Sequence, residues 1–393
     1  MQHDKIDALI NRFKVKYIHL DNLFGGKLDA TKNGKHIIDT VNIFISFESL
    51  YNSLRRNDVE KIVMEADKKQ LKGLYRCMMS NFINVAAHYR EYFNRHKIAT
   101  NIIYYYNEIV DDYSMYNNSA FISGYRDYFA ETLFDTERSA INGMVADSVQ
   151  FMELITEYID GVYMVSTKEL ESSLVPYVIL MQNKFPANMN IMITKDEYDY
   201  SYLLKNFLII SKYKKEPIIL TKYNLMKFLD FKNDCTNKDE KFTLHPNLFP
   251  FIQAFLGDKK RSIGKIPKVG YKSVRECIMQ LYEIGYIFNE DPETMSFNNL
   301  TAVLADVNPS ILKDNTMIDD LCRFHQAFDL DYQYSVASKA QIEDVMSCLK
   351  NKYDYSALAE LNNKYFDYCP LMLMELERYN PKYDTKTFKA IDD

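Results

Sequence analysis

Short apolar segments rich in β-branched and aromatic residues alternate with helical segments over roughly the first 225 residues of the chain. Apolar residues recur at helical spacing over residues 48–97 and 137–158, and another helix is expected to open near Thr167. The expected strands are residues 36–47, 101–106, 162–165, 190–194, 207–211 and 217–220. Because parallel neighbouring strands need a long crossover connection, this alternation predicts an α/β fold with a mainly parallel central sheet flanked by helices.

The length of the chain predicts more than one domain. With 393 residues, 47% of them hydrophobic and 26% charged, the composition is that of an ordinary globular protein. We expect an α/β domain over residues 1–245, a second region over 246–309 and a helical C-terminal extension over 310–393. The sequence does not reveal the role of that extension.

Charge and cysteine content bear on partners and compartment. The formal net charge of -6 argues against a dedicated nucleic-acid binder, although an average conceals local patches. The six cysteines lie far apart without a C-x-x-C pair, which favours reduced thiols in a cytosolic protein. No run of about 18 apolar residues occurs and the first residues do not form a signal peptide, so we expect a cytoplasmic protein without a membrane partner.

A strongly basic segment interrupts this acidic chain. Lys259–Arg275, KKRSIGKIPKVGYKSVR, holds seven Lys or Arg and no Asp or Glu. Gly264 and Gly270 lie on either side of Pro267, and a helix is expected to begin near Tyr271. Glycines let backbone N–H groups approach a ligand, and helix N-termini favour anions. The segment is therefore either a clamp on a nucleic-acid phosphate backbone or a solvated basic loop.

The text FIQAFLGDKKRSIGKIPKVGYKSVRECI resembles the helix-three-turn-helix region of the flap endonuclease and 5′–3′ exonuclease superfamily, including the phage 5′ nucleases called ribonuclease H. Gly257-Asp258 matches the Gly-Asp of the family, and Ile266–Ser273 follows its turn, over roughly 30 residues in all. In the family this element grips duplex DNA, often through a monovalent cation held by backbone carbonyls. The resemblance implies that role for Gly264, Lys265, Lys268, Gly270, Lys272 and Ser273.

The resemblance also implies a PIN/5′-nuclease-like α/β domain with carboxylates at the carboxyl ends of its parallel strands. Such carboxylates would hold two Mg²⁺ or Mn²⁺ ions for phosphodiester hydrolysis, with water activated by metal rather than by a side chain. The implied metal ligands are Glu169, Glu171, Asp196, Asp199 and Asp258. The family's arch, which passes a single-stranded 5′ end, would fall in residues 107–130, where Tyr125-Arg126 offers a stacking ring and a DNA-binding cation.

The acidic pattern departs from the family at three positions. Ser46 and Ser172 stand where carboxylates are usual, and Arg261 stands where an Asp is expected. Fewer carboxylates bind metal more weakly, and an arginine repels it. Glu169 and Glu171 also suit an ordinary helix start, because acidic side chains favour the first turn.

Three hypotheses follow. The first is a structure-specific 5′ nuclease, of phage type and replicative role, acting on DNA or RNA–DNA duplexes with a 5′ end or flap. The second is a nuclease-derived DNA-binding or structural protein that has lost catalysis, which Ser46, Ser172 and Arg261 favour. The third is a convergent turn in a phage scaffold or virion component. The chain contains no H-E-x-x-H, G-x-S-x-G or Walker A motif that would suggest other chemistry.

Overall fold

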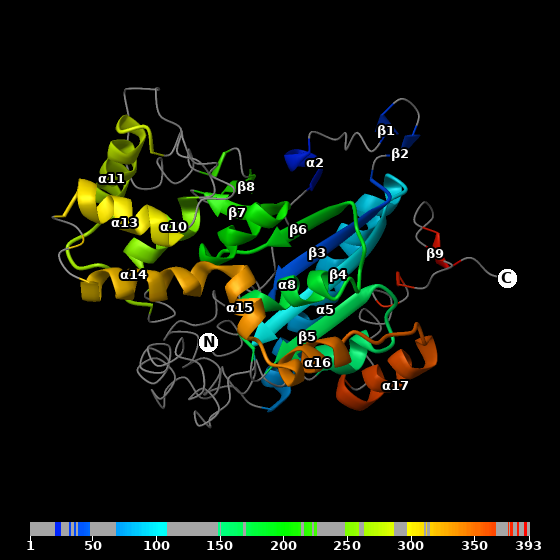
Figure 1. Ribbon diagram of the computed structural model, residues 1–393. Coiled ribbons are helices and arrows are strands. Elements are labelled where there is room, and N and C mark those ends of the chain that lie inside the picture. The colour runs from blue at the N-terminus through cyan, green and yellow to red at the C-terminus, as the bar shows by residue number, and fades with distance from the viewer. Residues whose placement is uncertain are drawn as a thin grey trace, which may run out of the picture.

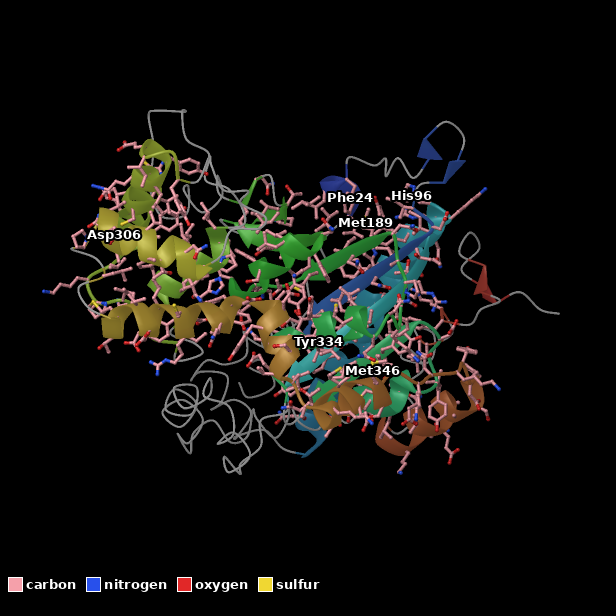
Figure 2. The ribbon with its side chains drawn as sticks, in the orientation of Figure 1. Phe24, His96, Met189, Asp306, Tyr334 and Met346 are labelled. Atoms are coloured by element: carbon pink, nitrogen blue, oxygen red, sulfur yellow. The ribbon has the colours of Figure 1, made fainter. Side chains whose placement is uncertain are left out.

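The computed structural model gives the arrangement of most of the chain (Figure 1). It describes residues 20–24, 31–32, 35–36, 38–47, 68–107, 148–149, 151–167, 170–213, 216–221, 224–225, 248–258, 263–286, 297–309, 312, 315–366, 376, 378–379, 383–384 and 389–390. No helix among these residues has the length and apolar character needed to cross a membrane. The four described cysteines, Cys77, Cys277, Cys322 and Cys348, carry free thiols.

A six-stranded sheet forms the centre of the molecule, with the strand order β5-β4-β3-β6-β7-β8. Neighbouring strands from β5 through β7 are parallel, and β8 pairs antiparallel with β7. Its strands are β3 (Thr40–Ser46), β4 (Ala99–Asn107), β5 (Val162–Thr167), β6 (Met189–Ile193), β7 (Phe207–Tyr213) and β8 (Glu216–Leu220). Each coincides with an expected strand, so the predicted fold class is confirmed. Separate short hairpins pair β1 (Thr31–Lys32) with β2 (Lys35–His36) and β9 (Tyr383–Asp384) with β10 (Lys389–Ala390).

Both faces of the sheet are covered, which explains why its strands are mostly apolar. Ile43 and Ile45 face one core together with α5 (Lys68–Arg95), while Phe44 faces the other core. That second core includes α8 (Val175–Met181), the 3₁₀ helix η4 (Tyr198–Lys205) and α10 (Phe249–Leu256). The helix expected near Thr167 starts later, because β5 runs through Thr167 and the short 3₁₀ helix η3 begins at Ser172.

A ladder of asparagines crosses three strands inside the sheet. Asn101 Nδ2 donates to Asn42 Oδ1 at 3.0 Å, and Asn42 Nδ2 donates to Asn190 Oδ1 at 3.0 Å. Asn42 Nδ2 also donates to the carbonyl oxygen of Phe185 at 2.8 Å. The three asparagines are direct neighbours in the register of β4, β3 and β6. Because a shift by one residue would bury these amides without partners, the ladder favours the observed register.

The order of the strands creates a switch point at β3 and β6. The chain leaves β3 through α5 to β4 on one side, then returns from β5 through η3 and α8 to β6 on the other side of β3. Ligands of open α/β sheets bind outside the carboxyl ends of the strands at such a point. The carboxyl ends here are Ser46 on β3 and Thr194 directly after β6.

The remaining helices join the sheet to a helical region. In Figure 1, α14 runs alongside α10 and α13, whereas α15, α16 and α17 lie beside the sheet. Contacts of α14 with α10 and α13, and of α15 and α16 with α8, agree with that view. The bounds are α2 (Leu20–Leu23), α11 (Tyr271–Glu283), α13 (Phe297–Val307), α14 (Asn315–Phe328), α15 (Leu330–Val336), α16 (Lys339–Ser347) and α17 (Tyr355–Phe366). Within the expected extension, residues 315–366 are mainly helical and the β9–β10 hairpin follows them; α14 packs on α10 and α13, and α15 and α16 pack on α8.

Candidate nucleic-acid interface and carboxylate turn

The basic segment begins with a tight loop after α10. Gly257 ends that helix with φ +65° and ψ -177°, a conformation that only glycine adopts readily. Asp258 and Ile263 exchange backbone hydrogen bonds of 3.1 and 2.9 Å, which closes the loop. A Cβ on residue 257 would lie 2.4 Å from the carbonyl oxygen of Gly264. The Gly-Asp pair seen in the sequence therefore has a structural reason in the backbone itself.

A four-residue turn follows at Ile266–Val269. The N–H of Val269 donates to the carbonyl of Ile266 at 3.2 Å, and Pro267 and Lys268 occupy the two central positions. Lys268 has φ +62°, in the left-handed region that favours glycine. Pro at the second position and positive φ at the third are the signature of a type II turn. A lysine therefore stands where the backbone would favour glycine.

The turn divides its side chains between core and solvent. Ile266, Val269 and Tyr271 are buried, and all three belong to the core shared with α10 and the sheet. The residues predicted to bind DNA lie on the other side: Gly264, Lys265, Lys268, Gly270 and Lys272 are exposed and Ser273 is partly exposed. Gly270 precedes the first turn of α11, whose leading N–H groups favour an anion. The structure thus presents the predicted cations on an apolar, anchored support.

At the switch point, a buried carboxylate joins two strands. Ser46 pairs in register with Tyr105, and Thr194 follows β6 on the same edge. Thr194 Oγ1 donates to Asp199 Oδ2 at 2.5 Å, and the Tyr105 hydroxyl donates to the same oxygen at 3.3 Å. Asp199 is only 2% exposed. Its carboxylate is held by protein hydroxyls beneath the carboxyl edge of the sheet.

Asp196 lies nearer to solvent on the same turn and is partly exposed. Its backbone N–H donates to Thr194 Oγ1 at 3.0 Å, and its Oδ1 accepts from the N–H of Tyr198 at 3.1 Å. These bonds fix the turn between β6 and η4, so Asp196 has a structural role whether or not it binds metal. We call Thr194–Asp199 the carboxylate turn.

Two buried tyrosines remain hydrogen-bond donors beside Asp199. Burial first, and then the negative charge of Asp199, raises the pKa of Tyr105 well above its usual range. The same two causes, in the same order, raise the pKa of Tyr202. The Tyr202 hydroxyl donates to the carbonyl of Ser173 and accepts from the N–H of Tyr177 at 3.1 Å. Tyr202 of η4 therefore ties η3 and α8 to the helix that follows the carboxylate turn, while Tyr105 of β4 donates to Asp199 within that turn.

Among the residues that the structure describes, the other predicted metal ligands are not brought together with Asp196 and Asp199. Glu171 stands at the N-cap of η3 without a cap hydrogen bond from its side chain, and Asp258 closes the loop after α10 through its backbone. Glu169, Arg126 and Arg261 lie outside the described residues. Within the described part of the chain, no group of three or more His, Cys, Asp or Glu side chains could hold a metal ion. The carboxylates in the described part of the chain do not by themselves fit a two-metal centre.

Sequence reasoning did not identify several residues that shape these sites. Tyr105 and Thr194 bind the buried Asp199, and Phe324 of α14 lies against Gly264. Thr194 carried a weak signal, because a hydroxyl residue directly followed an apolar strand. The contact of Phe324 joins residues 60 positions apart and left no local pattern.

The mainly parallel sheet and its switch point agree with the α/β architecture that the motif resemblance implies. The chain is similar to a bacteriophage T5 flap endonuclease, solved as a pseudo-enzyme–product complex with DNA and metal ions: 11% identity, TM-score 0.43, covering 86% of this chain and 99% of that chain. It is also similar to T5 5′-exonuclease with bound zinc, at 11% identity and TM-score 0.40, covering 78% and 99%.

A third similar structure is the catalytic core of Rad2 in complex with DNA substrate, at 12% identity and TM-score 0.41, covering 85% of this chain and 92% of that chain. No family model matches the sequence, and no curated protein matches it. Because their TM-scores are below 0.5 and their identities are 11–12%, these similarities carry no argument here.

Proposed function

We propose that this protein binds the phosphate backbone of duplex DNA through the exposed turn at residues 264–273, close to a 5′ end or flap. The observation that carries the proposal is that this turn exposes its lysines and buries its apolar side chains. Lys265, Lys268 and Lys272 point to solvent, whereas the apolar residues between them are buried. Fixed cations beside open helix N–H groups suit phosphate oxygens. A monovalent cation bound by carbonyls of the turn is part of the same proposal.

Backbone binding of this kind has a measurable signature. Each neutralised phosphate contributes about -0.9 to the slope of log K against log salt concentration, so the three lysines contribute about -2.7. The net charge of -6 is no obstacle, because a Debye length of about 10 Å at 0.1 M salt screens distant carboxylates. Binding through phosphates also carries no sequence preference.

We further propose that the DNA end reaches the carboxyl edge of the sheet at β3 and β6. Cleavage of the DNA there would depend on Mg²⁺ or Mn²⁺, which an activity assay tests directly. Asp196 is partly exposed on the carboxylate turn, and with Glu169 it belongs to the metal ligands that the motif resemblance implies. Divalent ions would supply an activated water and stabilise the leaving oxygen. Since the described carboxylates do not form a metal cluster, we derive no step of hydrolysis from them.

A second candidate is DNA binding without cleavage. The observation in its favour is the hydroxyl character of the edge: Ser46 and Ser172 are buried there, and Asp199 is committed to Thr194 and Tyr105. A carboxylate that is 2% exposed and already accepts two hydroxyl hydrogen bonds is poorly placed to coordinate an ion.

One experiment separates the candidates. Wild-type protein is incubated with labelled 5′-flap DNA and with an RNA–DNA hybrid in Mg²⁺, Mn²⁺ or EDTA, and binding and cleavage are both measured. Asp196→Asn keeps the acceptor oxygen for Tyr198 but removes the charge, so its folding should be retained. Metal-dependent cleavage that this variant loses supports the nuclease, and binding without cleavage supports the second candidate.

The binding surface is tested with Lys265, Lys268 and Lys272 changed together to Gln. Lys339→Gln is the matched control, because Lys339 is an exposed lysine on α16 that pairs with Glu343 much as Lys272 pairs with Glu276. We expect the triple variant to lose most binding and the control to retain it. Equal affinities of the triple variant and the wild type would refute the proposal.

A further inference from the structure

Helix α14, in the C-terminal extension, contacts the exposed turn at residues 264–273, which we call the basic turn. The ring of Phe324 lies where a side chain of residue 264 would be: a Cβ there would meet Cζ of Phe324 at 2.5 Å. Gly264 lets this ring approach the turn closely, and its own φ is not positive. Although 60 residues separate them in sequence, α14 forms one flank of the exposed turn.

One turn further along, the C-terminal end of α14 and the start of α15 contact Tyr198 of the carboxylate turn. Phe328 packs on Tyr198 with ring centroids 5.4 Å apart, and the Tyr198 hydroxyl donates to the carbonyl of Ala327. Gln333 donates to the same hydroxyl and is buried. Both ends of residues 324–333 are therefore fixed, one to the basic turn and one to the carboxylate turn. Side chains of α14 beside Phe324 are held in place relative to the turn.

Arg323 is the cation that α14 presents beside this contact. Its guanidinium lies 5.5 Å from the centroid of the Phe324 ring, and its side chain is 60% exposed. Nη2 pairs with Asp320 Oδ1 at 2.8 Å, three residues back on the same helix. Exposed pairs of this kind contribute about 0–1 kcal/mol to stability, so packing gives little reason for an arginine at this position.

We propose that α14 is part of the DNA interface, with Arg323 binding a backbone phosphate next to those bound at the turn and Phe324 positioning the turn. This inference rests on the proposed DNA binding. The planar guanidinium suits two phosphate oxygens at once, and the ring below it restricts its orientation. When a DNA phosphate replaces Asp320 as the partner of Arg323, only a weak surface ion pair is lost. The C-terminal extension thereby gains a function in substrate binding.

Three variants test the cation. The affinity for a 5′-flap duplex is measured by fluorescence anisotropy between 50 and 300 mM KCl. Arg323→Gln should reduce the magnitude of the salt slope by about 0.9, which corresponds to about eightfold weaker binding at 0.1 M salt. Asp320→Asn releases Arg323 and should bind as tightly as wild type or more tightly. Lys339→Gln, which removes an exposed cation from α16, should leave both affinity and slope unchanged.

Phe324 is tested against a neighbour that packs elsewhere. Phe324→Leu removes the ring beneath Gly264, whereas Phe328→Leu removes a ring that packs on Tyr198. Both should lower the melting temperature. If Phe324 positions the turn, its variant alone should also reduce the salt slope at a temperature where circular dichroism shows both variants folded. Equal slopes for the two variants would reduce Phe324 to a packing residue and refute its positioning role.

The outcomes distinguish the role of α14 from the proposed DNA binding on which it rests. If wild-type protein does not bind DNA at low salt, both are wrong. If the triple lysine variant loses binding while Arg323→Gln keeps the wild-type affinity and slope, the turn binds DNA and only the role of α14 is refuted.

Discussion

Lys268 is the residue at which backbone strain and proposed function oppose each other. At φ +62° a non-glycine residue in the left-handed region costs about 1–2 kcal/mol, which glycine would not incur. Glycine also adds about 0.5–1 kcal/mol of chain entropy to the unfolded state. Lys268→Gly should therefore stabilise the protein by a net 0.5–1 kcal/mol or so. The same change removes one exposed cation and should weaken DNA binding about eightfold at 0.1 M salt.

Lys265→Gly is the matched control. Lys265 is also exposed in the turn but has no positive φ, so glycine relieves no strain there. We expect this variant to lose about 0.5–1 kcal/mol of stability while its DNA binding weakens about as much as that of Lys268→Gly. The two variants should thus move in opposite directions in stability and in the same direction in affinity.

Urea unfolding followed by circular dichroism gives the stability, and anisotropy titration at several salt concentrations gives the affinity. A loss of stability in Lys268→Gly equal to that in Lys265→Gly would show that the turn is not strained. Unchanged affinity in Lys268→Gly, with a normal salt slope, would show that Lys268 does not contact phosphate. Either result would refute the reasoning that strain is retained at this position for function.

Three further predictions concern stability. Gly257→Ala should cost about 2–3 kcal/mol in urea unfolding, because its Cβ would meet backbone at 2.4 Å. Gly270→Ala has open space around it and should cost less, about 0.5–1 kcal/mol, because alanine is a poorer helix N-cap than glycine; equal losses in the two variants would contradict this. Asn42→Ala should cost about 3–4 kcal/mol by breaking the asparagine ladder, and a loss below 1 kcal/mol would disprove its importance. Burial lowers the pKa of His325 from 6.5 to about 4, so the unfolded chain protonates first as the pH falls. Unfolding free energy should fall by about 2 kcal/mol between pH 7 and pH 5, and His325→Gln should lose that component of the pH dependence.

The basic turn shows which features of a site can be predicted from residues that are close together in the sequence. Its glycines, proline and lysines lie next to one another in the chain, so their type and spacing predict an exposed, phosphate-binding turn. The positive φ of Lys268 was not predicted, because lysine does not mark a left-handed position as glycine does. The motif resemblance also suggests carboxylates that follow β5 and β6, namely Glu171, Asp196 and Asp199. Whether they converge depends on their depth below the surface, and Asp199 lies buried under Thr194 and Tyr105.

The sequence by itself determined the strands, the parallel fold class and the cationic turn. Period, β-branching and turn chemistry are properties of residues that are near one another in the chain. The tertiary structure alone decided which distant residues meet: the asparagines across three strands, Tyr198 with Ala327, and Phe324 with Gly264. These contacts arise from packing among elements separated by tens of residues. A single sequence carries no local periodicity that records such contacts.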